Sequence, residues 1–463
     1  MAQNRVSRRS ALLIATIASF LTPFMSSSVA VALPQMGAQF HADAVTLSWV
    51  STSYLLAAAM CMVPIGRIAD IFGRKRLLAL GLGVFALSTI LSASSVSAGM
   101  LIGCRAIEGM GGAMIAGTGM AILISVYPPQ ERGRVLGINA AATYTGLSLG
   151  PVLGGLITEH LGWRAVFLGI MPLAILAVVL LVFRLPGEWA EARGEDFDMT
   201  GAVVYGLALL TIMLGFSRLP ALLGFVLLVV GLAALGGFVA WEARTRHPLL
   251  SVHLFRDNTV FAMSNLAALL NYSATFAVTF MMSLYLQYIK ALSPQQAGLV
   301  LVAQPLVQAL FSPLAGRLSD RLEPRVVASA GMGLNVLGLL LLVLLGHDTS
   351  LPFIIASLLL LGFGFALFSS PNTNAVMSSV EKRLYGVASG TLGTMRVVGQ
   401  MFSMGTVMLV FSLYIGRTEI TSEVFGSFVG SARIVFATFA GLCTLGVFAS
   451  LARGRVKRVQ AAE

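Results

Sequence analysis

Charged residues are scarce in this sequence. Asp, Glu, Lys and Arg make up 11 % of its 463 positions, against about 25 % in water-soluble domains. So little charge cannot cover a water-soluble globule, and that class is excluded. Cysteine is also rare: Cys61, Cys104 and Cys443 lie in or beside apolar stretches, and no disulfide framework is indicated. The apolar stretches contain no cluster of His, Asp or Cys residues with the spacing of a metal site or a catalytic nucleophile. The sequence also has no glycine-rich loop of the kind that binds nucleotide phosphates. We therefore expect neither an intramembrane enzyme nor ATP-driven transport.

The sequence is instead rich in long apolar runs. Hydrophobic residues make up 57 % of it, and about twenty apolar residues are enough to cross the roughly 30 Å hydrocarbon core of a bilayer. The alternating ten-residue stretches of outer-membrane barrels are absent. The runs predict an all-α membrane protein with about fourteen transmembrane helices, near 11–33, 46–65, 77–97, 99–127, 134–158, 163–184, 198–217, 220–242, 258–286, 295–316, 324–346, 351–379, 385–414 and 430–451.

The net charge of +11 comes from Lys and Arg residues that lie between the predicted spans rather than in one patch, which argues against a nucleic-acid partner. With a cytoplasmic N-terminus, about 23 basic residues fall on the cytoplasmic side and about 5 on the other. This bias places both termini in the cytoplasm. Arg8-Arg9 followed by an apolar run also resembles a twin-arginine secretory signal, but thirteen later spans favour a retained first helix.

The chain contains an internal repeat. The link at 66–76 reads GRIADIFGRKR, and the link at 316–325 reads GRLSDRLEPR, about 250 residues later. The sequence therefore contains two groups of six helices that repeat each other, with two further helices inserted between the groups. We expect a six-helix bundle at 1–184, an inserted two-helix linker at 185–257, and a second six-helix bundle with a cytoplasmic tail at 258–463.

The link at 66–76 carries the most specific motif. Its two glycines permit a tight turn, Asp70 can face a helix N-terminus, and its basic cluster favours the cytoplasmic side. It resembles the signature loop G-x-L-A-D-x-x-G-R-K of the major facilitator superfamily, in the fourteen-helix branch with many drug–proton antiporters. The resemblance covers essentially the whole chain and implies the major facilitator fold. A merely topogenic basic loop is the alternative. The resemblance implies a latch that joins the halves in the outward-facing state, with candidates Gly66, Asp70, Gly73, Arg74, Glu131 and Asp320.

The predicted span at 134–158 contains a glycine run that resembles the family's antiporter signature. Its candidate residues are Gly146, Gly150, Pro151, Gly154 and Gly155. Glycines four apart share one helical face and let another backbone approach, while proline bends the axis. Such a run packs helices in any case, so its implication of efflux rests on the resemblance.

The predicted span at 99–127 contains Arg105 and Glu108, which resemble the family's R-x-x-Q-G motif with glutamate in place of glutamine. A charge at mid-membrane persists only where it is paired or faces a watery cavity. Residues three apart meet on one helix face, so a neutral pair that fixes packing is one interpretation. Glu108 is also the only acidic residue well inside a predicted span, so the other interpretation is proton coupling, with Arg105 biasing its ionisation.

The first predicted span departs from the branch. It ends like the motif L-D-x-T-I-V-N-V-A-L-P, but Met25 stands at the aspartate position and Ala30 at the asparagine position. In a stretch that resembles W-R-W-x-F-x-x-N-x-P, Ile170 replaces the asparagine. The usual coupling carboxylate is therefore missing, and non-standard coupling is expected.

Polar and aromatic residues within the spans are candidates to line a largely apolar substrate cavity. Each can equally tie helices together, and Arg396 can snorkel or bond backbone carbonyls. The set comprises Tyr54, Asn139, Asn265, Asn271, Tyr272, Gln304, Gln308, Asn372, Asn374, Arg396 and Gln400.

Together these features predict a secondary active transporter that works by alternating access. We expect export of hydrophobic or amphipathic small molecules, of the multidrug type, by proton antiport across a bacterial or archaeal cytoplasmic membrane. An exporter of an organic anion or lipid-like metabolite with non-standard coupling is the alternative within transport, and a non-transporting membrane receptor or scaffold is the alternative outside it. The expected partners are the substrate, protons and the lipid bilayer, with no cofactor and with the chain acting as a monomer.

Overall fold

The structure is a computed structural model that describes residues 2–245, 248–381 and 384–454, without the side chains of 2–7, 129, 130 and 320. Every regular element within these ranges is helical. Fourteen helical segments of the described chain are long and apolar enough to cross a membrane, which confirms the predicted number of spans.

The first bundle contains six long helices. They are α1 (Ala2–Phe40), α2 (Ala44–Phe72), α3 (Arg74–Ala93), α4 (Ala98–Val126), α5 (Pro129–Leu161) and α6 (Trp163–Arg184). Sequence-local groups set several of their ends. Asp43 accepts a hydrogen bond from the backbone N–H of Thr46 at 2.7 Å and so caps α2. Gly73, with φ of +116°, makes the turn into α3.

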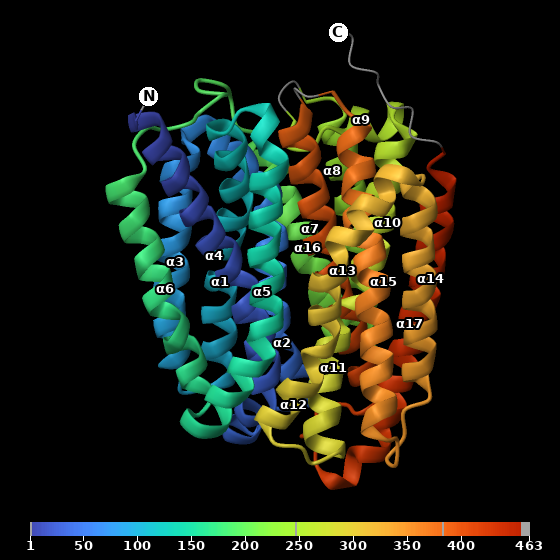
Figure 1. The fold of residues 1–463 in the computed structure, drawn as a ribbon. Coiled ribbons are helices and arrows are strands. Elements are labelled where there is room, and N and C mark those ends of the chain that lie inside the picture. Colours follow the sequence, from blue (N-terminus) through green and yellow to red (C-terminus); the bar gives the residue numbers. More distant parts are fainter. Residues whose placement is uncertain (1, 246–247, 382–383, 455–463) are drawn as a thin grey trace.

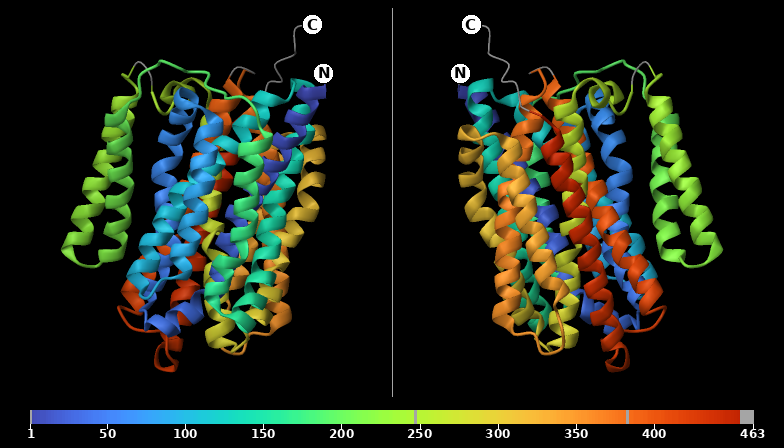
Figure 2. Two further views of the ribbon diagram at one scale, coloured as in Figure 1. Left: turned by 90° about the vertical axis from the view of Figure 1, so that its left-hand side faces the viewer. Right: turned by 90° about the vertical axis from the view of Figure 1, so that its right-hand side faces the viewer.

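The inserted pair consists of α7 (Met199–Arg218) and α8 (Leu222–Glu242), followed by the short helix α9 (Val252–Asp257). Figure 2 shows the pair at one edge of the molecule. Its contacts with both bundles run through α7 and the turn after it. The Tyr205 hydroxyl donates to the Ala59 carbonyl at 3.1 Å, and the Ser412 hydroxyl donates to the Leu219 carbonyl at 2.5 Å. The pair is therefore anchored where the two bundles meet.

The second bundle also provides six spans, two of them interrupted. The first is made of α10 (Thr259–Thr275), α11 (Ala277–Leu284) and the π-helical turn η1 (Tyr285–Ile289), and the next is made of α12 (Pro294–Leu301) and α13 (Ala303–Arg321). The remaining helices are α14 (Pro324–Val343), α15 (Leu351–Ser378), α16 (Tyr385–Tyr414), the 3-10 turn η3 (Ser422–Val424) and α17 (Phe425–Ala452). Interrupted spans are tolerated where the freed backbone groups are buried in protein.

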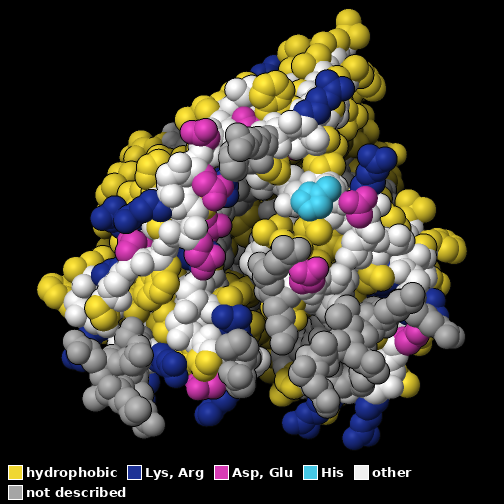
Figure 3. Space-filling view, turned by 90° about the horizontal axis from the view of Figure 1, so that it is seen from above, with side chains coloured by type: hydrophobic (Ala, Val, Ile, Leu, Met, Phe, Trp, Pro, Cys, Tyr) yellow, Lys and Arg dark blue, Asp and Glu magenta, His cyan; other side chains and the backbone are white. Residues whose placement is uncertain are grey.

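The two bundles stand side by side (Figure 1). The start of α1 and the end of α17 lie at the same end of the molecule, as an even number of spans requires. We call this the terminal end and the opposite one the far end. Lys, Arg, Asp and Glu side chains gather on the terminal end (Figure 3).

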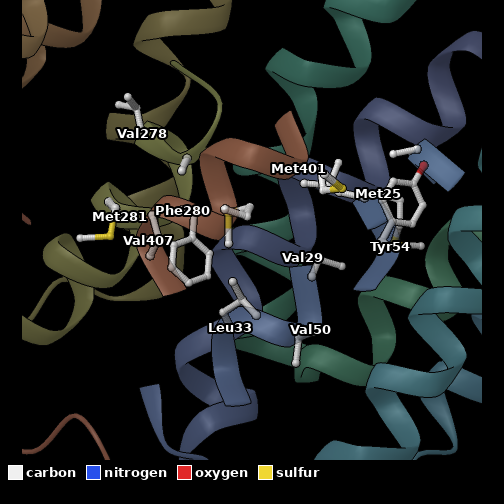
Figure 4. Close-up of a cluster of buried hydrophobic side chains, with 14 of the residues drawn as sticks. Met25, Val29, Leu33, Val50, Tyr54, Val278, Phe280, Met281, Met401 and Val407 are labelled. Carbon is white, nitrogen blue, oxygen red and sulfur yellow. The ribbon is translucent and has the colours of Figure 1, made fainter. Parts of the chain in front are cut away.

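The two bundles are joined tightly toward the far end. The Ser283 hydroxyl donates to the Ala30 carbonyl at 2.7 Å, and the Gln287 amide donates to the Val31 carbonyl at 2.9 Å. The Glu159 carboxylate accepts from the Ser293 hydroxyl at 2.5 Å. Residues 27–34 of α1 are all buried, and Figure 4 shows this stretch in an apolar cluster with α11 and α16.

Toward the terminal end, the described contacts between the bundles are sparse. The Ser389 hydroxyl lies 3.0 Å from the Met120 sulfur, and the Tyr144 hydroxyl lies 3.4 Å from the Ser369 hydroxyl. The described part of the chain thus adopts a conformation that is sealed toward the far end, which is one of the two states that alternating access requires.

Candidate functional site

The ion pair predicted within α4 is present and completely buried. Nη1 of Arg105 lies 2.8 Å from Oε1 of Glu108, and the two side chains are 1 % and 0 % exposed. No other described donor reaches the Glu108 oxygens. Glu108 lies ten positions into α4, about 15 Å along the helix from its far-end start. The pair therefore sits deep in the membrane-spanning region.

Tyr54 of α2 covers this ion pair. The guanidinium carbon of Arg105 is 4.5 Å from the centre of the Tyr54 ring, a distance at which cation and ring attract. The Arg105 Nε also donates to the Val50 carbonyl at 3.4 Å. Two glycines of α4 make room: a Cβ on Gly109 would collide with the Tyr54 carbonyl oxygen, and one on Gly112 would lie 2.5 Å from the Tyr54 hydroxyl. The sequence motif thus positions α2 as well as the charges.

Met25, at the position where the branch carries aspartate, is fully buried. Met25 belongs to the same buried apolar cluster as Met401 of α16 and Tyr54 of α2, and Figure 4 draws all three. An apolar cluster with side chains from both bundles therefore occupies this position. Glu108 is the acidic group near Tyr54, because its partner Arg105 lies against the Tyr54 ring.

Arg396 of α16 lies in a second polar cluster, between the bundles. Its Nη2 donates to the Thr373 hydroxyl at 2.6 Å, and its guanidinium carbon lies 5.7 Å from the centre of the Tyr272 ring. Tyr272 packs edge-to-face on Phe365 with centroids 5.2 Å apart. Arg396 and Tyr272 of the predicted cavity set are therefore brought together, and Thr373 and Tyr144 are additional members that the sequence did not single out.

Several predicted cavity residues are instead buried inside one bundle. Asn265 donates to the Phe261 carbonyl at 2.9 Å, and Asn271 accepts from Asn335 at 3.0 Å. Asn372 donates to the Ser264 carbonyl at 3.1 Å. Asn271 and Asn372 tie α10 to neighbouring helices in this conformation, whereas Asn265 bonds a carbonyl of its own helix.

The other predicted cavity residues range from buried to exposed. Asn139 of α5 accepts from the Ser19 hydroxyl of α1 at 2.9 Å, and Asn374 donates to the Ser319 hydroxyl at 3.2 Å. Gln308 is buried in α13, while Gln304 and Gln400 are half-buried.

The predicted latch loop binds the linker at 185–198 in this conformation. Arg74 contacts Asp70 at 2.8 Å and Glu191 at 2.8 Å, and its Nη1 donates to Ser125 at 2.5 Å. The Glu188 carboxylate accepts from the backbone N–H of Lys75 at 2.8 Å, at the positive N-terminus of α3.

Backbone contacts complete this junction between loop and linker. The N–H of Ala192 donates to the Asp70 carbonyl at 2.9 Å. A Cβ at Gly73 would meet Glu188 Oε1 at 2.6 Å, so the glycine is required for the approach as well as for its positive φ. The acidic linker residues were missed from the sequence. Three glutamates within one short link could have predicted this contact, because the loop at 66–76 is basic.

The remaining latch candidates lie apart from this junction. Glu131 pairs with Arg8 of α1 at 3.6 Å. Gly66 lies inside α2 with open space at its Cβ position. Asp320 lies in α13, and its side chain is outside the described residues.

The glycine run of α5 lies against α1 and α12. A Cβ on Gly146 would lie 2.7 Å from the Phe20 carbonyl oxygen, and one on Gly154 would lie 2.7 Å from Ser28 Cα. The Ser28 hydroxyl donates to the Gly150 carbonyl at 2.9 Å. A Cβ on Gly155 would collide with the Pro294 carbonyl oxygen. Pro151 contributes its carbonyl, which approaches Gly298 of α12. The run therefore joins the two bundles toward the far end.

Arg453, counted from the sequence as a basic tail residue, is an internal anchor. Its side chain is 1 % exposed and donates to Asn372 at 3.0 Å and to Ser450 at 2.8 Å. Burial, with a smaller contribution from the nearby Arg325, lowers the pKa of Arg453 to about 10. Sequence position alone gave no signal for this role.

Fourteen candidate membrane-crossing helices of the described chain, six in each bundle and two in the inserted pair, with charges buried among them, are the architecture of a multi-pass membrane transporter. The chain belongs to the Major Facilitator Superfamily, which it matches over residues 15–252 and 264–462.

Curated relatives cover most of the chain. The riboflavin transporter RibZ of Clostridioides difficile is 28 % identical over 94 % of this chain and 95 % of its own length. The cephamycin export protein CmcT of Amycolatopsis lactamdurans is 32 % identical over 92 % of this chain and 90 % of its own length. The multidrug resistance protein Stp of Mycobacterium tuberculosis is 28 % identical over 88 % of this chain and 76 % of its own length.

A solved structure shares the fold. The human organic anion transporter MFSD10 superposes with a TM-score of 0.64 over 96 % of this chain and 99 % of that one, at 17 % identity. At that identity the likeness concerns the fold alone.

Proposed function

We propose that this transporter exports amphipathic small molecules and that Glu108 couples export to proton entry. The observation that carries the coupling is the sealed pair of Arg105 and Glu108, which is buried deep in the bundle and has no other described donor on the carboxylate. An acid at such depth is costly, and those that persist are commonly proton relays. Export as the direction is supported by two relatives whose names state multidrug resistance and cephamycin export.

The proposed cycle needs water to reach Glu108 from each side in turn. In the present conformation the pair is fully buried and the Tyr54 ring lies against Arg105. Tyr54 in turn belongs to the apolar cluster that contains Met25 and Met401. Rocking of the bundles would open this apolar cluster and expose the face of Tyr54. Protonation of Glu108 then weakens its attraction to Arg105, which links proton uptake to that movement.

The proposed orientation places the terminal end in the cytoplasm. The basic residues of the links lie at this end, as the positive-inside rule expects. Proton entry contributes about 2.3 kcal/mol per 100 mV of membrane potential and about 1.4 kcal/mol per unit of pH difference. One proton per cycle is therefore enough for a cargo gradient of more than tenfold.

Liposomes test this coupling. The purified chain is reconstituted, a pH step is imposed, and accumulation of rhodamine 123 and of fluorescein is followed for wild type and Glu108→Gln. We expect pH-driven accumulation of at least one dye by wild type, and its loss in Glu108→Gln with dye binding retained.

The double variant Arg105→Gln/Glu108→Gln is the decisive control. It restores neutrality to the buried site, so a pair that only fixes packing predicts normal transport. Proton coupling at Glu108 predicts that the double variant folds and still fails to respond to pH. Normal pH-driven transport by the double variant would therefore exclude the proposed role.

A further inference from the structure

We propose that Arg396 is the cargo-binding residue for an oxyanion, so that the exported molecules are amphipathic organic anions such as carboxylates. This inference rests on the proposed export function and specifies its substrate class. The binding site comprises Arg396 and Thr373, with Tyr272 and Tyr144 beside them.

Arg396 lies at the depth where a carrier holds its cargo. It is eleven positions into α16, about 16 Å along the helix from its terminal-end start. That is near the middle of a hydrocarbon core of roughly 30 Å. Cargo sites of duplicated carriers lie near the midplane, where the two halves meet.

Arg396 has no counter-charge among the side chains that the structure describes. Its Nη2 donates to the neutral Thr373 hydroxyl, and its Nε is buried with no hydrogen-bond partner. The other deep arginine, Arg105, has Glu108 at 2.8 Å. An arginine at this depth needs an opposite charge or water around it, and its planar fork fits an oxyanion with two hydrogen bonds. A bound anion would supply the missing charge.

The groups around Arg396 come from both bundles. Thr373 of α15 donates to the Ser369 carbonyl at 2.8 Å, and the Ser369 hydroxyl lies 3.4 Å from the Tyr144 hydroxyl of α5 in the first bundle. An anion held by Arg396 therefore lies beside the interface that opens and closes. Binding there can influence the movement between the bundles.

Aromatic rings beside Arg396 favour a cargo with an apolar body. Tyr272 lies 5.7 Å from the guanidinium carbon and packs edge-to-face on Phe365. Ligand sites commonly combine such apolar walls with a few placed polar groups. An uncompensated cation repels cationic cargo. The buried acid that would attract such cargo, Glu108, is engaged by Arg105, which lies against the Tyr54 ring.

Two xanthene dyes of similar shape and opposite charge test the site. Fluorescein carries a carboxylate, whereas rhodamine 123 is a cation. Fluorescence polarisation with the purified full-length chain measures binding of each dye to wild type, Arg396→Gln and Arg396→Lys. Arg433→Gln is the matched control, because Arg433 bonds the Leu345 carbonyl at 2.7 Å, away from this site.

We expect wild type to bind fluorescein more tightly than rhodamine 123. Loss of charge-assisted hydrogen bonds should weaken fluorescein binding by about tenfold or more in Arg396→Gln, with an intermediate loss in Arg396→Lys. Rhodamine 123 binding should stay unchanged or tighten, and Arg433→Gln should match wild type. Equal fluorescein affinity of wild type and Arg396→Gln, or no preference of wild type for the anion, would overturn the assignment.

Transport by the same proteins in liposomes separates this inference from the function on which it rests. Export of rhodamine 123 but not fluorescein by wild type would refute the anion site and leave export standing. Fluorescein binding that depends on Arg396, with neither dye transported, would support the site and refute export.

Discussion

The two bundles treat their deep arginines differently. In the first, Arg105 is neutralised by Glu108 and covered by Tyr54. In the second, Arg396 has a neutral hydroxyl as its partner and lies near Tyr272. Each tyrosine is approached by a glycine, Gly109 or Gly399. An arginine, a tyrosine and a glycine thus surround a neutralised ion pair in the first bundle and an arginine without a described counter-charge in the second. This difference suits a carrier that must bind a proton and a cargo at separate sites.

The largest effect on stability is expected from removing the carboxylate of the Arg105–Glu108 ion pair. Glu108→Ala leaves Arg105 as a buried, uncompensated charge, so we expect it to lower the free energy of unfolding by about 3–5 kcal/mol. Thermal unfolding in detergent measures this loss. The double variant Arg105→Gln/Glu108→Gln should recover most of it, and equal losses in the single and double variants would contradict the ion-pair account.

Substitutions of the two glycines that approach the tyrosines should have the next largest effect on stability. A Cβ on Gly109 would collide with the Tyr54 carbonyl, and one on Gly399 would lie 2.6 Å from the Leu269 carbonyl oxygen. We expect Gly109→Ala and Gly399→Ala each to cost about 1–3 kcal/mol through overpacking.

Their functional effects should differ between the bundles. Gly109→Ala should impair the response to pH, and Gly399→Ala should impair fluorescein binding. Gly103→Ala and Gly390→Ala are matched controls in the same two helices, because a Cβ there meets nothing within 4 Å. Interchanged effects of the two substitutions would contradict the separation of proton and cargo sites.

A smaller effect on stability is expected where the charge has no counter-charge. Arg396→Gln removes no ion pair among the described residues, so the free energy of unfolding should change by no more than about 1 kcal/mol. Thermal unfolding beside Glu108→Ala measures the contrast directly. A loss as large as that of Glu108→Ala would show that Arg396 has a buried structural partner.

The smallest effect is expected at the junction between the loop at 66–76 and the linker at 185–198, in the first bundle. Glu191 is 68 % exposed in its pair with Arg74, so Glu191→Gln should cost about 0.2–1 kcal/mol. Asp70→Asn should cost more, because Asp70 contacts Arg74 through both Nε and Nη2. Thermal unfolding and transport of the two variants test this order, and a larger effect of Glu191→Gln would contradict it.

Long apolar runs and the repeated loop were sufficient to predict the fourteen spans and the family, because both signals are local in sequence. The pairing of Arg105 with Glu108 was also predictable from their spacing on one helix. The cover provided by Tyr54, the apolar cluster that Met25 and Met401 share, and the burial of Arg453 were not predictable, since each depends on which helices become neighbours. For the same reason the sequence did not distinguish Asn271, which ties helices, from Arg396, which lies between the bundles.

Proton movement driven by cargo tests the central claim most directly. Liposomes loaded with fluorescein and a pH-reporting dye of separate colour are diluted into cargo-free buffer, and the internal pH is followed. Wild type should move protons inward as cargo leaves, whereas Glu108→Gln should move none while still exchanging labelled for unlabelled cargo. Cargo-driven proton movement of wild-type size in Glu108→Gln would contradict the account.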